Sequence, residues 1–430
     1  MSEFDAIIVG AGPAGSSAAI KLASSGLTTL LVEKADPPGS KNVSGGIMWG
    51  NELGGVLPDW EKDAPLERYV ISKGTGLLTS DSLISVDFRS RKFESRKTGY
   101  SVLRAKFDQY LANKAKSKGA TLVTGVTVDG LALKDGKVAG VIQEGDEITA
   151  DTVILAEGVN PRVAISSGLR PEIGDKDVAI GVKQVVKLSE ATINERFNIR
   201  GNSGFAGEYV LGFLKNGVKA GGFLYTNKET ISVGAVINVG TLRADNETHS
   251  FEIMDQFVNH PFISPYLEGG KMEEYSAHLV CEGGIGSVPK IYGDGYLIAG
   301  DAAGFSYSNG LIIQGINYAI TSGIAAADTV IEAKSKSNFS SGMLRGYEDR
   351  LQGKYVLKDL KKFRGIEEVT WSNLAHKALP DIAEETLFNL FYEEGIPKRH
   401  LMEIVLSATK KSGVKKTDMI LEAYRTMRRM

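Results

Sequence analysis

The sequence predicts an α/β protein with an inserted, mainly antiparallel β domain and a helical C-terminal region. At the N-terminus an apolar run, a glycine-rich loop and a helical pattern follow one another directly, as in a β-α-β unit. Residues 166–284 alternate or run apolar between glycine-rich turns, which indicates β-strands. From Lys334 onward the composition is helical and charged. A chain of 430 residues is long for one core, so several subdomains are expected.

The first element is an N-terminal unit with a complete dinucleotide-binding pattern. An apolar strand over 4–9 leads into Gly10-Ala-Gly-Pro-Ala-Gly15, and the helical pattern that follows stops at Gly26. A second strand over 28–32 is ended by Glu33, roughly 20 residues beyond the glycines, where a ribose-binding acid is expected. This order of elements predicts a Rossmann-type domain.

Each residue of the glycine motif has its own physical reason. Gly10 allows the tight turn, Gly12 lets the backbone approach a pyrophosphate, and Gly15 lets helix and strand pack closely. The phosphates would lie at the positive N-terminus of the helix, and Glu33 can accept hydrogen bonds from the ribose hydroxyls. The unit suits NAD as well as FAD.

Two later stretches favour FAD. Residues 100–111 read as a strand running into a helix, and they resemble the segment by which aromatic-hydroxylase-like flavoproteins place an arginine near the flavin pyrophosphate. Arg104 is the candidate. Residues 121–155 read as hairpin strands and a closing strand that leads to Ala156-Glu-Gly158. Such a β-meander recurs in flavoproteins with two dinucleotide folds, and we expect Val126 beside the adenine.

A third stretch places an acid at the end of a strand. The strand that begins at Tyr296 delivers Gly300-Asp301 at its carboxyl end, where open α/β sheets bind ligands. Asp301 can hydrogen-bond a ribitol chain. The helix that follows runs through Ala327, and its positive N-terminus can stabilise anionic reduced flavin. A second dinucleotide motif is missing from the sequence, so no dedicated nicotinamide domain is predicted.

Composition excludes several classes of protein. The net charge of −2 argues against a nucleic-acid binder. Cys281 is the single cysteine, so the chain forms no disulfide framework, and it lacks the roughly four cysteines that an iron–sulfur cluster needs. No apolar run reaches the roughly 20 residues of a membrane-spanning helix, so any membrane contact is expected to be peripheral. The five histidines, His278 among them, form no cluster, and no metal site is predicted.

Charge is concentrated toward the C-terminus. Residues 334–430 contain 19 Lys and Arg against 13 Asp and Glu, which is a local charge of +6 in a chain of net charge −2. Two interpretations stay open: a solvated helical tail, or a docking surface for an acidic partner or for anionic lipid headgroups.

These patterns predict three regions. The FAD-binding domain comprises 1–70, 98–165 and 285–335, the quinone or substrate β domain comprises 71–97 and 166–284, and the helical C-terminal region comprises 336–430.

Several stretches together resemble FixC proteins of the electron transfer flavoprotein–quinone oxidoreductase family. They are Glu33-Lys34, Gly39–Gly46, Tyr100–Asp108, Gly221–Asn227, Glu274–His278 and Leu297–Gly304. The match runs in order from residue 2 to at least Glu348 and weakens beyond it.

The resemblance implies FAD as cofactor, an electron transfer flavoprotein as donor, ubiquinone or menaquinone as acceptor, and a cytoplasmic location on the inner face of the cell membrane. Longer members carry a C-terminal iron–sulfur domain, for which this chain has neither the length nor the cysteines. FixC-like subunits work instead with a separate ferredoxin-like chain, FixX. Such an assembly can divide electron pairs from NADH between quinone and ferredoxin.

The motif and the resemblance together give a set of expected cofactor-binding residues, in which 41–46 would lie near the isoalloxazine ring. The set is Gly10, Gly12, Pro13, Ala14, Gly15, Glu33, Lys34, Lys41, Ser44, Gly45, Gly46, Arg104, Val126, Ala156, Gly158, Gly300, Asp301, Gly310, Ile312 and Ile313. The flavin is the expected reactive centre, and residues 205–213 with Ile312 and Ile313 are candidates to line a quinone channel.

Three other functions fit the same fold. A geranylgeranyl reductase would reduce isoprenoid double bonds, although the Tyr-x-Trp-x-Phe-Pro signature of that group is absent from the sequence. An aromatic hydroxylase would use NADPH and oxygen. An electron-transfer or assembly subunit would have no quinone site of its own.

Overall fold

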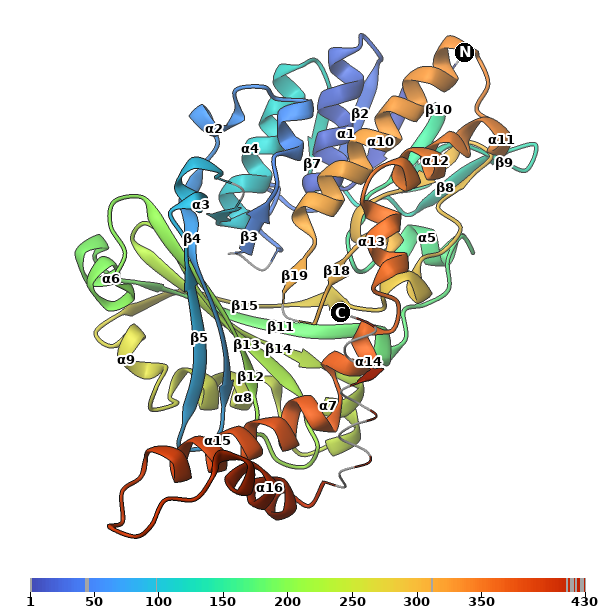
Figure 1. Ribbon diagram of the computed structural model, residues 1–430. Coiled ribbons are helices and arrows are strands. Elements are labelled where there is room, and N and C mark those ends of the chain that lie inside the picture. The colour runs from blue at the N-terminus through green and yellow to red at the C-terminus, as the bar shows by residue number, and fades with distance from the viewer. Residues whose placement is uncertain are drawn as a thin grey trace.

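The computed structural model describes residues 2–42, 46–97, 99–310 and 312–414, and the single positions 417, 421, 424, 425 and 429. It contains two large sheets. One lies among helices in the upper right of Figure 1, and the other crosses the lower half of the view. The predicted combination of an α/β domain, an antiparallel β domain and a helical C-terminal region is confirmed.

The first sheet is parallel at its centre and carries an antiparallel hairpin. Its strands, in spatial order, are β16 (Tyr292–Gly293), β17 (Tyr296–Ile298), β10 (Asp146–Leu155), β1 (Phe4–Val9), β2 (Thr29–Glu33) and β7 (Thr121–Thr124), and the hairpin is β8 (Gly130–Lys134) with β9 (Lys137–Gln143). The long helices of this domain are α1 (Pro13–Ser24), α4 (Arg104–Ser117) and α10 (Ile316–Ser335).

The glycine loop between β1 and α1 leaves no room for side chains at two positions. Gly10 has a φ of +103°, and a Cβ atom there would lie 2.3 Å from the Ala156 oxygen. A Cβ atom on Gly15 would lie 1.9 Å from the Gly10 oxygen. Pro13 begins α1, where its fixed φ suits the first helical turn. These contacts bring α1 directly onto the first sheet.

The predicted meander and its closing strand are one continuous element. The first residues of β10 pair with β9, and its last residues pair with β1 and β17. The turn of the β8–β9 hairpin, Asp135-Gly136, has positive φ at both residues, as a tight hairpin turn requires.

The second sheet has nine strands. They are, in order, β15 (Lys271–Cys281), β11 (Val178–Lys187), β14 (Thr230–Asn238), β13 (Ala220–Thr226), β12 (Ser203–Leu211), β4 (Leu66–Leu78), β6 (Gly99–Val102) and β3 (Gly46–Trp49), with β5 (Leu83–Arg89) beside β4. One face is covered by a core with α6 (Glu190–Phe197) and α8 (Ser250–Val258).

The predicted division between the two domains crosses this sheet. Residues assigned to the FAD-binding domain form β3, β6 and the start of β4, which hydrogen-bond within the second sheet. Met48 and Tyr100, however, pack in the core of the first domain. These strands thus belong to one domain by hydrogen bonding and to the other by packing, and the division stays a prediction.

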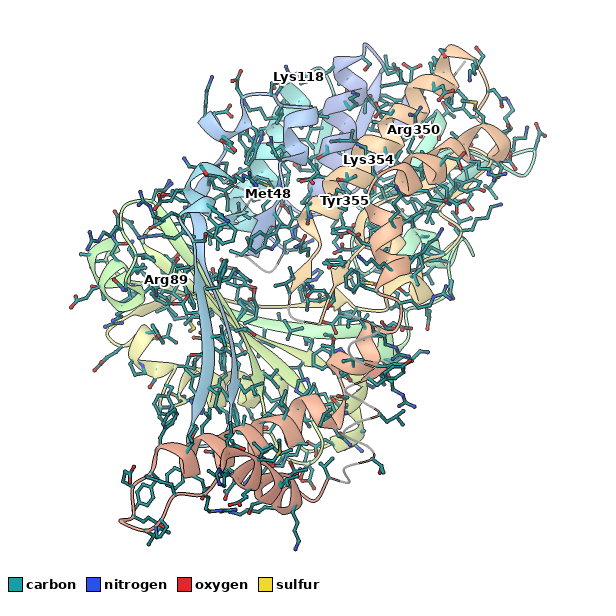
Figure 2. The ribbon with its side chains drawn as sticks, viewed as in Figure 1. Met48, Arg89, Lys118, Arg350, Lys354 and Tyr355 are labelled. Carbon is teal, nitrogen blue, oxygen red and sulfur yellow. The ribbon has the colours of Figure 1, made fainter. Side chains whose placement is uncertain are left out.

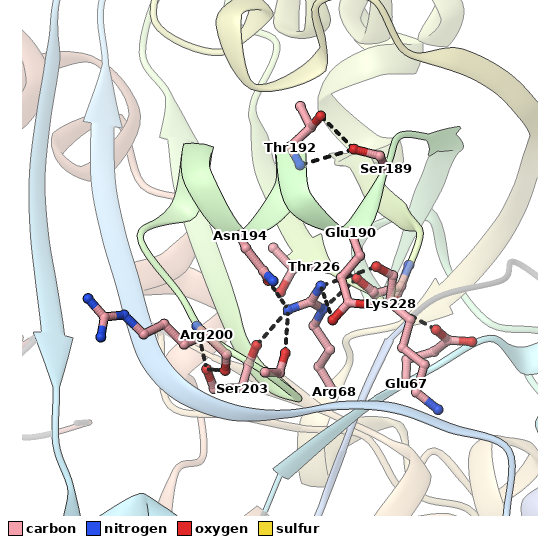
Figure 3. Close-up of polar contacts among 12 residues, drawn as sticks. Glu67, Arg68, Ser189, Glu190, Thr192, Asn194, Arg200, Ser203, Thr226 and Lys228 are labelled. Atoms are coloured by element: carbon pink, nitrogen blue, oxygen red, sulfur yellow. Dashed lines mark hydrogen bonds and ion pairs between the residues drawn. The ribbon is translucent and has the colours of Figure 1, made fainter.

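A buried arginine joins β4 to the turns beside it (Figure 3). Arg68 is fully buried and donates through Nε to the Asn227 oxygen at 2.7 Å. Its Nη1 donates to Asn194 Oδ1 at 2.6 Å and to the Ser203 oxygen at 3.0 Å. The guanidinium therefore holds α6, the start of β12 and the β13–β14 turn against one strand.

The C-terminal region divides between the two domains. Its elements are α11 (Ser341–Leu344), α12 (Gly346–Gly353), α13 (Val356–Lys362), α14 (Ile366–Thr370), the π-helix η5 (Leu374–Ala378), α15 (Leu379–Phe391) and α16 (Leu401–Lys411). Arg350 and Tyr355, labelled in Figure 2, form hydrogen bonds with α10. Arg350 contacts Thr329, and Tyr355 contacts Thr321. By contrast, α15 and α16 lie under the far ends of β4 and β5 (Figure 1), where Glu384 accepts a hydrogen bond from Ser82.

Short elements complete the described residues. They are η1 (Glu52–Gly55), α2 (Trp60–Asp63), α3 (Lys92–Ser95), α5 (Arg162–Ser166), η2 (Asp175–Asp177), α7 (Val239–Asp245), α9 (Ser264–Leu267), η3 (Gly284–Ser287), η4 (Gly300–Ala303), and the two-stranded pair β18 (Tyr307–Ser308) and β19 (Ile313–Gln314).

Candidate functional site

A cavity of about 1000 Å³ lies between the two sheets and is closed on one side by the C-terminal region. The glycine loop and the end of β17 line it from the first domain. The face of the second sheet opposite its helix-covered core forms its floor, and residues 369–382 form a wall. Its volume lies at the upper end of the range for ligand sites in proteins.

The glycine-loop end is braced by an acid. Glu33 accepts hydrogen bonds from the backbone N–H of Ala11 and of Ala35, each at 2.8 Å. It also lines the cavity. Unlike Gly10 and Gly15, Gly12 faces open space, because the nearest atom to a Cβ built there is Arg104 Nη2 at 4.0 Å. The loop therefore presents bare backbone to the cavity beside a guanidinium, an arrangement that fits a pyrophosphate.

Arg104 is held in place by a buried carboxylate. Its Nε and Nη2 each donate to Asp108 at 2.8 Å, and Asp108 has no solvent exposure. Asn42 also donates to Asp108, at 2.5 Å. Burial by itself would lower the pKa of Arg104, but the carboxylates of Asp108 and Asp301 outweigh it and raise that pKa. The cation is thus fixed in position and remains charged.

Asp301 occupies the turn after β17, at the N-terminal end of α10. The Gly300 N–H donates to Ser322 Oγ on α10 at 2.9 Å, which ties this turn to the helix. A Cβ atom on Gly315, the residue before α10, would lie 3.8 Å from Asp301 Oδ1. Burial raises the pKa of Asp301, and Arg104 and His278 act against this rise. The positive ends of two helices, α1 and α10, and one fixed arginine therefore surround this end of the cavity.

Most of the sequence-predicted cofactor residues meet in this cavity. Those that line it are Gly10, Gly12, Pro13, Ala14, Glu33, Lys34, Lys41, Gly46, Arg104, Ala156, Gly158, Gly300, Asp301, Gly310, Ile312 and Ile313. Gly15 and Val126 are outside the lining. Gly15 packs against the Gly10 backbone, and the Val126 N–H donates to the backbone oxygen of Glu33 at 3.1 Å. Ser44 and Gly45 lie outside the described residues.

Strand β12 contains most of the predicted quinone-channel residues 205–213, and its side chains point alternately to the cavity and to the core. Glu208, Tyr209 and Val210 of β12 line the cavity, although the Tyr209 ring packs near Phe257 in the core on the opposite face. Phe205 instead packs on the opposite face, with its ring centre 5.3 Å from that of Phe197. Phe213 stacks on His260, also away from the cavity. Successive residues of a strand point to opposite faces, so the side chains of 205–213 divide between the cavity and the core.

The predicted range 205–213 includes Glu208 but assigns it no role, and no sequence pattern indicated Tyr225 on the sheet floor or the polar residues of the C-terminal wall. Glu208 and Tyr225 lie on the floor. Trp371 and His376 lie in the wall, where their rings stack with centres 5.2 Å apart. Glu208 is a single acid inside an apolar run. Strand alternation would have placed this acid on the face opposite to that of its neighbours Gly207 and Tyr209. The wall residues follow no local motif, because tertiary packing alone brings them to the cavity.

A buried carboxyl group supports the wall. Trp371 Nε1 donates to Glu282 Oε2 at 2.7 Å. Burial raises the pKa of Glu282 to about 7, although the Trp371 hydrogen bond acts against this rise. Burial and the charge of Lys219 lower the pKa of His376 to about 4, so this imidazole is neutral near pH 7. Next to Glu282, Cys281 is buried, and burial raises the pKa of its thiol to about 11.

Similarity to known proteins identifies the family of this chain. Residues 5–218 match the family described as FAD dependent oxidoreductase. The chain is 38% identical over 414 residues to the probable electron transfer flavoprotein-quinone oxidoreductase YdiS of Escherichia coli K12, with 96% of each chain covered. The chain belongs to the electron transfer flavoprotein–quinone oxidoreductase family. FixC proteins within this family include that of Escherichia coli K12 (38% identity, 96% of each chain) and that of Azorhizobium caulinodans (36%, 92% of each). The chain is accordingly an FAD-dependent oxidoreductase, as the resemblance predicted.

Solved structures share the fold of this family member. A geranylgeranyl bacteriochlorophyll reductase-like protein from Thermoplasma acidophilum has a TM-score of 0.69 at 22% identity, covering 98% of this chain and 99% of that one. The myxobacterial halogenase CndH has a TM-score of 0.60 at 17% identity, covering 99% and 90%. At these identities the likeness concerns the fold alone.

Neither a metal site nor a membrane span is found among the described residues. No group of three or more His, Cys, Asp or Glu side chains among them is arranged to hold a metal ion. No helix in the same part of the chain has the length and apolar character needed to cross a bilayer.

Proposed function

We propose that this family member passes electrons from an electron transfer flavoprotein, through its FAD, to a membrane quinone. The full-length similarity to YdiS and FixC supports this assignment. The donor would be the two chains of an electron transfer flavoprotein, and a ferredoxin-like FixX chain would carry the iron–sulfur cluster. The acceptor would be ubiquinone or menaquinone, at the inner face of the cell membrane.

FAD supplies the redox chemistry when bound, and the residues of this chain bind and orient it. The pyrophosphate would lie at Gly12 and the N-terminus of α1, with Arg104 neutralising its charge. Glu33 would accept hydrogen bonds from the adenosine ribose. Asp301 would hydrogen-bond the ribitol, and the N-terminus of α10 would stabilise negative charge on the reduced ring.

The observation that carries the proposal is the reach of the cavity. From the glycine loop it extends across the sheet to Leu379 and Ile382, the residues of α15 that line it. Apolar side chains, Leu77, Val210 and Val236 among them, line the floor on the way. A long apolar passage that begins at the redox cofactor suits a quinone ring with a prenyl tail, which leaves toward α15.

The surface around α15 and α16 supports a membrane position for this exit. These helices and the loop between them expose several large apolar side chains, including Phe391 at 75% and Met402 at 67%. Arg399 and Lys410 lie along the same segment, as does Lys398, which is paired with Glu393. An apolar surface with flanking cations is typical of peripheral contact with anionic lipid. A prenyl tail could then pass from the bilayer into the cavity without crossing water.

An electron-transfer assay tests this function. Reduced electron transfer flavoprotein should reduce a short-chain quinone analogue only when the FAD-loaded chain is present. NADPH without the donor flavoprotein should give no turnover, which separates this function from that of a prenyl reductase or hydroxylase. Rapid NADPH oxidation coupled to a prenyl lipid or an aromatic acid would contradict the proposal, as would failure of the quinone to react.

A further inference from the structure

Glu208 is an acid placed in the middle of the cavity floor. In the second sheet it pairs with Phe223 on β13 and with Thr75 on β4, and all three residues line the cavity. Its neighbour Tyr209 packs in the core on the other side of the sheet. Lys73 and Tyr225 lie one step along the same face, both paired with Ala206.

These three polar side chains form one connected group. Lys73 Nζ lies 2.7 Å from Glu208 Oε1 and 2.5 Å from Oε2. The Tyr225 hydroxyl donates to Oε1 at 3.1 Å. Lys73 Nζ also lies 5.2 Å from the centre of the Trp49 ring, which lines the cavity from β3. We call Lys73, Glu208 and Tyr225 the floor triad.

The floor triad lies in apolar surroundings, which are unfavourable for charged groups and so reduce the stability of the folded protein. Ile47, Val70 and Ala206 form an apolar cluster against which Trp49 and Tyr225 pack. An ion pair in such a place often contributes less to stability than apolar residues of similar size. Burial raises the pKa of Glu208 against the effect of Lys73, and it raises the pKa of Tyr225 well above the usual value. Perturbed groups in a cleft are typical of functional sites.

The proposed function gives this group a task. Reduction of a quinone to a quinol takes two electrons and two protons. Bound FAD in its anionic reduced form would supply both electrons and one proton. The second proton has to reach a quinone oxygen inside a cavity with apolar walls, where an acid on the floor is favourably placed.

We propose that the floor triad delivers this second proton, with Glu208 as its carrier; the inference rests on the proposed quinone reduction. As negative charge develops on the quinone oxygen, a Lys73 N–H bond breaks and the proton moves to Glu208. The Glu208 O–H bond then breaks as the quinol O–H bond forms. A proton taken up from bulk solvent then restores the charge of Lys73. Tyr225 holds the carboxylate in position and is a positioning residue.

The test compares two electron acceptors on chemically reduced holoenzyme. In Glu208→Gln, reoxidation by a quinone analogue should slow by about 10- to 100-fold, because general acid catalysis is lost. Reoxidation by a one-electron acceptor that takes up no proton should keep the wild-type rate. Glu273→Gln is the matched control, because Glu273 pairs with Lys187 on the same sheet, 3.5 Å away and outside the cavity lining. It should slow neither reaction.

Two further measurements do not rely on the reaction rates of that variant. In wild-type protein, deuterated water should slow the quinone reaction and leave the one-electron reaction unchanged. Difference infrared spectra should show a carboxyl signal that changes when a quinone analogue binds and that is absent from Glu208→Gln. Equal quinone rates in Glu208→Gln and wild type, or equal slowing with both acceptors, would overturn the relay alone. A wild-type protein that reduces only the one-electron acceptor would overturn the proposed function as well.

Discussion

Arg68 illustrates how much a single buried side chain contributes to this fold. Its guanidinium donates to the backbone oxygens of Asn227, Gly201, Ser203 and Lys228 (Figure 3). Those oxygens lie in the β13–β14 turn and around the start of β12, so one side chain on β4 connects segments that are distant in sequence. A buried acceptor that loses its donor costs about 1–3 kcal/mol.

Replacing this arginine should therefore weaken the whole molecule. We expect Arg68→Met to lower the free energy of unfolding by about 3–5 kcal/mol, because several buried oxygens lose their donor together. Urea unfolding followed by circular dichroism measures the change. Arg89→Met, at an exposed residue labelled in Figure 2, should cost less than about 1 kcal/mol. Similar losses in both variants would show that burial of Arg68 has little energetic weight.

Glu282 makes stability depend on pH. Its pKa is about 7 in the folded protein against 4.5 for the unperturbed group, so the folded protein holds this proton more firmly. Stability is therefore lost as the pH rises from about 4.5 to about 7, and the loss is complete above that. A folded-state pKa that lies one pH unit above the unfolded value corresponds to ~1.4 kcal/mol.

The matched variant is Glu282→Gln, which resembles the protonated acid and can still accept from Trp371. We expect it to stabilise the protein by about 2–3 kcal/mol at pH 8 and by little at pH 4.5. Thermal and urea unfolding across this range give the difference. Glu147→Gln, at an exposed position of β10, is the control and should show no such trend. A constant difference between Glu282→Gln and wild type would contradict the raised pKa.

Within the part of the chain that the structure describes, α15, α16 and their connecting loop expose many large apolar side chains. We expect Phe391→Glu with Met402→Glu to reduce binding to vesicles that contain anionic lipid by tenfold or more, because both side chains are exposed beside the loop that joins α15 to α16. Sedimentation with vesicles measures binding. Phe251→Glu, at an exposed phenylalanine on α8, should bind as wild type does. Unchanged binding by the double variant would place the membrane contact elsewhere.

Element boundaries near the N-terminus could be predicted because they rest on local chemistry. Glycines with defined steric roles, Pro13 and the position of Glu33 determine β1, α1 and β2 within a short segment. The pairing of β6 with both β3 and β4 could not be predicted, since a short apolar strand does not encode its partners. The position of α15 and α16 under the second sheet could not be predicted from the sequence either, because it depends on tertiary packing against residues such as Gly212.

At the scale of the whole molecule, the site exists only where three regions meet. Local motifs predicted the residues of the glycine-loop end, each of which lies on the first domain. They gave Glu208 no role and did not predict Trp371, because these residues reach the cavity through the orientation of the second sheet and of the C-terminal wall. A composite site of this kind is visible from sequence only on the side where a motif binds the cofactor.

A cofactor that binds between regions should stabilise all of them. FAD at about 1,000 times its dissociation constant adds ~4 kcal/mol to the folded state. We therefore expect flavin-stripped protein to melt several degrees lower. Gly12→Val should fold and melt like that stripped protein, because its side chain enters open space that the pyrophosphate needs. Differential scanning fluorimetry with added FAD distinguishes the variants. Gly130→Ala, at an open position on β8, should respond to FAD fully.

The single cysteine can report local unfolding of the protein through its reaction with a thiol reagent. Cys281 is buried at the end of β15, and its thiol stays protonated under ordinary conditions because burial raises its pKa to about 11. A thiol reagent can modify it only after the second sheet opens, and one modification per molecule is the maximum. The rate at which mass increases by one label would thus report how often this sheet opens in native buffer, with no engineered probe.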